Sequence, residues 1–219
     1  MTTRYCVDAL TLGLSGNLFD MIGGGGANAA SLSLVGGNLN LSGSPNQTAD
    51  ATTTRAAGIY AKLRYGLSRQ QRITEDLSFF ASLSGQQTYK NLDSSEKFYI
   101  GGNDSVRAYP ANEAGGSDAH LVTFELRQRL MEGLVLTGLY DYGRIWINHN
   151  NNFTGSASPN TYSLQGAGLS LAWQTELGPT FKATWSHRIG RNPNPTSTGH
   201  DQDGSRVLDR FWLSAAVTF

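Results

Sequence analysis

Hydrophobic and polar residues alternate along most of this 219-residue chain. A period of two places alternate side chains on opposite faces, so the pattern predicts β-strands with one apolar face. The last segment shows it most clearly, because one face carries Phe211, Leu213, Ala215, Val217 and Phe219.

Nine segments follow this pattern and are predicted to be strands: 4–15, 29–41, 57–68, 76–89, 119–131, 134–147, 161–174, 179–190 and 207–219. Most have ten residues or more. Soluble strands average about five or six residues, whereas tilted membrane strands need about 9–11. In the second segment the pattern changes phase at Gly36 and Gly37, which we interpret as a β-bulge.

The predicted connections alternate in length. The long ones are 42–56, 90–118, 148–160 and 191–206, and the short ones are 69–75, 131–133 and 175–178. This rhythm is typical of outer-membrane barrels, which have long external loops and short periplasmic turns. The connection 16–28 breaks the rhythm, because it is predicted to be long where a short turn belongs. Residues 49–57 are predicted to form a turn or two of helix.

Composition agrees with a barrel and argues against other classes. No stretch approaches the roughly 18 apolar residues of a membrane helix, and the mean hydropathy of −0.32 suits strands that are apolar at alternate positions only. The formal net charge is zero, which argues against a nucleic-acid partner. Residues 1–4 lead directly into a strand pattern, so we expect no signal peptide in the chain.

We find no signal for catalysis, a metal or a cofactor. The glycines at 23–26 are not followed by the lysine of a phosphate-binding loop, and segment 199–204 lacks the later ligands of a calcium loop. No nucleophile elbow is present. Four histidines stand at no metal-ligand spacing: His120, His149, His187 and His200. We therefore expect a protein that is not an enzyme.

One arginine stands in a shaped loop between the fourth and fifth predicted strands. Gly101, Gly102 and Pro110 restrict this connection, and Arg107 lies within it. Asp141 stands in strand 134–147. On these residues alone, a solvated loop cation and an ordinary polar strand residue explain the pattern better than a pair.

The alternation also orients Asp141. Tyr140, Tyr142 and Trp146 share the opposite face of the strand. Aromatic residues suit the lipid interface, so Asp141 and Gly143 are predicted to point inward, and Glu125, Arg127 and Arg129 to line the inner face of their own strand.

The loop motif Gly101, Gly102, Val106, Arg107, Ala108, Tyr109, with segments 121–127 and 140–143, resembles the two-partner secretion transporters. These are the haemolysin secretion/activation proteins of Gram-negative bacteria. Segments 12–17, 24–28 and 211–219 also resemble that family, so the resemblance covers essentially the whole chain. It is closest to the C-terminal part of the family's barrel.

The resemblance implies an antiparallel transmembrane β-barrel in the outer membrane, with a loop that folds inward. Such a transporter secretes, and in some cases activates, a haemolysin- or adhesin-type exoprotein without a nucleotide. Matched position by position, Arg107 would pair with Asp141 and hold the barrel in a defined state. Its further partners would be outer-membrane lipid and the barrel assembly machinery, which would read the C-terminal strand signal Phe211, Leu213, Val217 and Phe219.

The chain departs from the family in three respects. Ala108 replaces a glycine, which would add strain of about 1 kcal/mol if that backbone takes a positive φ. We expect no periplasmic domain within residues 1–219. Nine strands are also fewer than the family barrel has, so we interpret the chain as part of a barrel, either a fragment or a truncated product.

Two other functional classes stay open on the sequence. A general porin or ligand-uptake barrel would explain the long strands and loops, but not the Arg107 motif. A soluble β-rich binding domain, such as a lectin, would explain the alternation alone.

Overall fold

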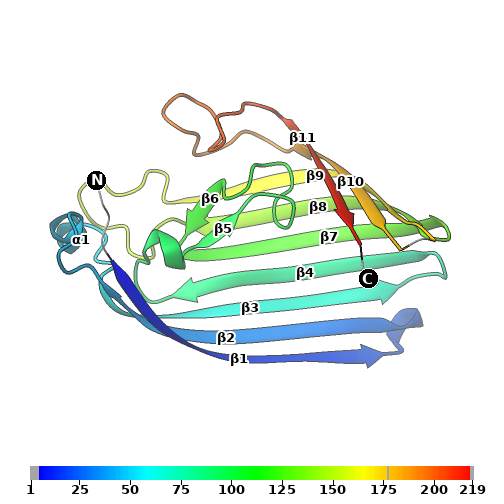
Figure 1. Cartoon of the computed structure of the whole chain (residues 1–219), viewed down its shortest axis with the longest axis horizontal. Coiled ribbons are helices and arrows are strands. Elements are labelled where there is room, and N and C mark those ends of the chain that lie inside the picture. The colour runs from blue at the N-terminus through cyan, green and yellow to red at the C-terminus, as the bar shows by residue number, and fades with distance from the viewer. Residues whose placement is uncertain (1–4, 177, 218–219) are drawn as a thin grey trace.

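The computed structural model describes residues 5–176 and 178–217 and confirms the all-β, antiparallel prediction. Nine long strands pair in chain order into one curved sheet (Figure 1). They are β1 (Cys6–Asp20), β2 (Gly26–Asn40), β3 (Gly58–Arg72), β4 (Leu77–Thr88), β7 (Asp118–Met131), β8 (Leu134–Trp146), β9 (Thr161–Gln174), β10 (Thr180–Arg188) and β11 (Asp209–Ala216).

The remaining elements lie in the connections. Between β4 and β7 the chain forms η2 (Ser94–Glu96) and a small hairpin of β5 (Phe98–Ile100) and β6 (Ala114–Gly116). The helical turn predicted in 49–57 is present slightly earlier, as α1 (Gln47–Thr52). Within the described residues, no helix has the length and apolar character needed to cross a membrane.

The prediction of a long connection at 16–28 is wrong. Strand β1 continues to Asp20 and β2 begins at Gly26, so only residues 21–25, which include η1 (Ile22–Gly24), form the turn. Gly24 and Gly25 have φ values of 97° and 104°, which glycine adopts without strain. The sequence pattern hid the strand ends because the polar residues Asp20 and Asn28 interrupt the apolar face near the turn. The turn therefore conforms to the long-short rhythm.

The two faces of the sheet differ in polarity. We call the face that loop 101–113 covers the inner face, and the opposite one the outer face. The outer face exposes large apolar side chains from most strands, with Leu10 80% and Leu213 84% exposed. Others on this face are Leu12, Leu14, Leu32, Leu34, Leu67, Phe124, Leu126, Leu169, Leu171, Phe181 and Phe211. An apolar surface of this extent suits hydrocarbon and not water.

The prediction of a bulge at Gly36 and Gly37 is also wrong. Both glycines continue the pairing of β2 with β1 and β3 without a register shift. The phase changes because the inner face becomes apolar at this end, where Val35 packs with Tyr60 and Leu92 in a buried cluster. Gly37 makes room for this cluster, since a Cβ there would lie 2.5 Å from Cζ of Tyr60.

The sheet is open. Within the described residues, β1 pairs only with β2 and β11 only with β10. Each edge strand therefore presents unpaired backbone groups, which hydrocarbon does not tolerate. Of the predicted C-terminal signal, Phe211, Leu213 and Val217 are exposed, and Phe219 lies outside the described residues.

Two adjacent glycines test this account of β2. We expect Gly37→Ala to lower the stability of the folded protein by about 1–3 kcal/mol, because the new methyl group displaces the buried Tyr60 ring. Gly36→Ala is the matched control, since nothing lies within 4 Å of its Cβ position. The midpoint of urea unfolding in detergent measures both, and equal midpoints for the two variants would contradict this packing.

Candidate functional site

Loop 101–113 connects β5 to β6 and lies against the inner face of β7, β8 and β9 (Figure 1). Gly101 and Gly102 start it with φ values of 105° and 102°, and the Gly102 amide donates to the Tyr109 carbonyl at 3.0 Å. This bond closes the loop on itself. The side chains of Val106 and Tyr109 are 0% exposed, so the loop behaves as part of the core and not as a surface connection.

Arg107 and Asp141, which the family resemblance suggested as partners, are in direct contact. The guanidinium donates from Nε to Oδ2 and from Nη2 to Oδ1 of Asp141, each at 2.8 Å. The backbone amide of Arg107 donates to the same carboxylate at 3.1 Å, and the Thr123 hydroxyl donates to it from β7 at 3.1 Å. Both charged side chains are buried, with residue exposures of 4% and 0%. This bidentate geometry fixes the direction as well as the position of the arginine.

Glu125 is a second carboxylate partner of Arg107. It accepts from Nη1 at 2.7 Å, and its other oxygen accepts from Nε of Arg127 at 2.8 Å. Two arginines thus face two carboxylates, and the cluster is neutral. We call Arg107, Asp141 and Glu125 the Arg107 lock. Removing one partner of such a buried group costs about 3–5 kcal/mol, because a charge is left without compensation.

Residues without side chains provide the space for the loop. A Cβ at Gly143 would lie 2.7 Å from Cδ1 of Ile100 and 3.0 Å from Cγ2 of Val106. Gly143 therefore acts as the floor beneath the loop and does not line an open path.

The strain expected at Ala108 is absent. Ala108 is not among the residues with positive φ, and its methyl group is 0% exposed. It lies over Gly166 on β9, where a Cβ would collide with it. The alanine therefore fits because its neighbour is glycine, a pairing that one sequence by itself does not reveal.

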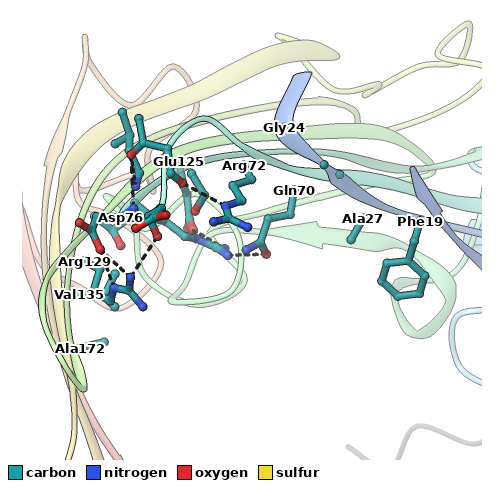
Figure 2. A pocket seen from close by; sticks show the side chains of 18 of the residues that line it. Phe19, Gly24, Ala27, Gln70, Arg72, Asp76, Glu125, Arg129, Val135 and Ala172 are labelled. Atoms are coloured by element: carbon teal, nitrogen blue, oxygen red, sulfur yellow. Dashed lines mark hydrogen bonds and ion pairs between the residues drawn. The ribbon is translucent and has the colours of Figure 1, made fainter. Parts of the chain in front are cut away.

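A cavity of about 950 Å³ opens on the inner face toward the short turns. Figure 2 shows that its walls come from strands far apart in the sequence, with Phe19, Arg72, Glu125 and Arg129 among the labelled side chains. Glu125 belongs both to this wall and to the Arg107 lock. Arg129 is half exposed and pairs with Asp76 of the neighbouring turn at 2.6 Å, so it lies at the cavity but does not reach the loop.

Strands β10 and β11 contact the other side of the loop. The indole Nε1 of Trp212 donates to the Arg107 carbonyl at 2.8 Å. The Arg188 guanidinium lies over the Tyr109 ring, 4.1 Å from its centroid. Neither residue was predicted from the sequence to contact the loop, and Glu125 was predicted only to line the inner face. The inward parity of Glu125, beside Thr123 and opposite the strand of Asp141, was the signal that could have identified it as a partner.

A reciprocal exchange tests the contact between Ala108 and Gly166. We expect Gly166→Ala to destabilise the protein by about 1–3 kcal/mol, since the site has no room for a second methyl group. Adding Ala108→Gly should restore most of that loss, because it removes the methyl group on the other side of the contact. The urea unfolding midpoints of the three variants check this; a double variant no more stable than Gly166→Ala would contradict it.

Comparison with known proteins gives relatives of one kind. Residues 20–172 match the family model of the haemolysin secretion/activation proteins ShlB, FhaC and HecB. The heme/hemopexin transporter protein HuxB of Haemophilus influenzae is 30% identical over 222 residues, covering 97% of this chain and 36% of its own length. HuxB of strain 86-028NP is 28% identical over 218 residues, with the same coverage. The chain thus spans about a third of the length of these relatives.

A solved structure supports the fold. CdiB from Escherichia coli matches with a TM-score of 0.66 and 14% sequence identity, and the match covers 97% of this chain and 37% of CdiB. The family model covers most of the chain, including the Arg107 loop, β7 and β8. The chain therefore belongs to the haemolysin secretion/activation protein family, ShlB/FhaC/HecB.

Proposed function

We propose that this chain forms the C-terminal part of an outer-membrane β-barrel that secretes an exoprotein of the haemolysin or adhesin type by two-partner secretion. The observation that carries the proposal is the Arg107 lock, which holds a loop on the inner face of a sheet whose outer face is apolar. A general porin or uptake barrel needs the apolar outer face, but it does not need a loop locked by three buried charged residues.

The contrast between the two faces supports a membrane location. A transmembrane barrel needs an apolar surface where it contacts lipid, and the exposed leucines and phenylalanines on one side of these long strands provide it. The open edges of β1 and β11 would pair with further strands of the same barrel. We therefore assign the chain to the outer membrane of a Gram-negative bacterium, where the barrel assembly machinery would insert it.

The cavity supports a path for an unfolded polypeptide. It opens at the turn end of the strands, which is the periplasmic side of such a barrel, and its wall includes Glu125 of the Arg107 lock. A chain entering there would meet the underside of loop 101–113. In this proposal the loop marks the closed state and moves when the substrate passes, and the folding of the substrate outside provides the driving force.

The lock gives the sharpest test of this function. In the intact transporter we expect Arg107→Ala and Asp141→Ala each to reduce secretion. The first leaves the buried Asp141 carboxylate without a cation, and the second leaves Arg107 with Glu125 as its one carboxylate partner in the lock, so that the cluster is no longer neutral; breaking a buried group of this kind costs about 3–5 kcal/mol. The double variant should lose less than the sum of the single effects, because the two residues act as one unit. The exoprotein in the medium, relative to the total made, measures secretion.

Arg64→Ala is the matched control for this test. Arg64 lies on β3 and also faces inward, but it bonds to Gln86 and not to the loop. Secretion should stay near the unmodified level. Strictly additive losses for Arg107 and Asp141, or an equal loss for Arg64→Ala, would show that the lock is not what secretion requires.

Two neighbouring residues of β4 test the membrane orientation. Leu83 faces outward and Ser82 inward, on the pairing of β4 with β7. We expect Leu83→Arg to lower the stability of the protein in lipid by about 2–4 kcal/mol near the bilayer midplane, whereas Ser82→Arg is tolerated. Folded and unfolded bands on unheated gels after refolding into vesicles report the difference. A larger loss for Ser82→Arg would reverse the assignment of the two faces.

A further inference from the structure

The C-terminal end of loop 101–113 carries a buried glutamate that is not part of the Arg107 lock. Glu113 is 4% exposed. One carboxylate oxygen accepts from the Asn192 side-chain amide, and the other accepts from the Gln202 backbone amide at 2.9 Å. Both donors belong to the connection between β10 and β11, so this residue ties loop 101–113 to loop 191–206.

Asn192 bridges two carboxylates. Its amide nitrogen has two hydrogens, and it donates to Glu113 and, at 2.9 Å, to Oδ1 of Asp201. Asp201 is 2% exposed, and its other oxygen accepts from the Arg188 guanidinium. The amide therefore lies between the two carboxylates and donates one hydrogen bond to each.

Arg188 completes the network on the loop itself. While it pairs with Asp201, its guanidinium also covers the ring of Tyr109, at 4.1 Å from the centroid. Burial raises the pKa of the Glu113 carboxyl. For Asp201 burial acts in the same direction, but hydrogen bonds from Arg188 and Asn192 leave its pKa below the ordinary value. The Glu113 carboxylate thus accepts from neutral donors, whereas Asp201 also pairs with two cations, Arg188 and, at 3.2 Å, Arg210.

We propose that Glu113, Asn192, Asp201 and Arg188 form a second latch, the Asn192 latch, which holds loop 101–113 in its closed position from the side opposite the Arg107 lock. The lock ties the loop to β7 and β8, and the latch ties it to β10 and loop 191–206. Loop 191–206 consequently acts as a strap, and both loops must part before loop 101–113 can leave the inner face.

This inference rests on the proposed movement of loop 101–113, but its test does not require secretion. Arg107 is 4% exposed, so trypsin can cut after it only when the loop opens. The rate of that cut follows the population of the open state when opening and closing are fast. The experiment uses the intact protein in detergent, with the new chain ends identified by mass spectrometry.

We expect Asn192→Ala to raise the rate of cleavage after Arg107 about tenfold or more, the equivalent of one hydrogen bond to a charged group. Asn194→Ala is the matched control, because Asn194 lies in the same loop but bonds to the Tyr162 hydroxyl. Asp201→Asn should also raise the rate. Its control is Asp209→Asn, since Asp209 lies nearby on β11 but pairs with His187 and not with a latch residue.

The outcomes separate the latch from a general loosening and from the proposed function. Faster cleavage in the latch variants alone supports the latch. An unchanged rate in Asn192→Ala, or an equal rise in the controls, overturns it. If Asp201→Asn does not fold, as judged by its migration on unheated gels, Asn192→Ala decides. If the latch variants speed cleavage after Arg107 but the intact protein secretes no exoprotein, the transport proposal is contradicted and the latch is still supported.

Discussion

The structure depends on one buried arginine. Arg107 reaches two strands at once, Asp141 on β8 and Glu125 on β7, and its backbone amide also bonds to Asp141. These groups can remain charged without water because Arg127 supplies the second cation, so that the four side chains together are neutral. A lysine could not replace this arginine, because a single ammonium cannot make the bidentate contact and the contact to Glu125 in a fixed plane.

The Arg107 lock requires glycines on the part of the sheet that the loop covers. Loop 101–113 approaches the sheet closely only because Gly143 and Gly166 have no side chains beneath it. The same sheet carries bulky apolar residues on its other face, so the two faces of β8 and β9 have different tasks at these positions. The inner face thereby holds a packed loop with a buried ionic cluster, while the outer face suits a hydrocarbon environment.

Two sets of contacts converge on the loop from opposite directions. The Arg107 lock uses charges on regular strands, which fix their positions well. The Asn192 latch uses an amide and a connecting loop, whose backbone adjusts more easily. In this arrangement the strand side fixes the position of the loop, and in our proposal the loop side sets how easily it opens. Glu125 adds a link to the cavity, since it contacts Arg107 and lines the cavity wall.

The sequence by itself determined the strands, their faces and the inward direction of Asp141, because a period of two is a local property of a strand that needs no knowledge of its neighbours. The prediction failed at 16–28, where polar residues near the turn interrupt the apolar face. It also failed at Gly36 and Gly37, where a covering loop makes the inner face apolar. The resemblance to a family paired Arg107 with Asp141. Only the tertiary structure showed that Glu125 is a partner of Arg107, that Gly166 leaves space for Ala108, and that Asn192 bridges two carboxylates. Each of these contacts joins residues far apart in the sequence, so no local period predicts it. Each depends instead on how a loop folds back over the sheet.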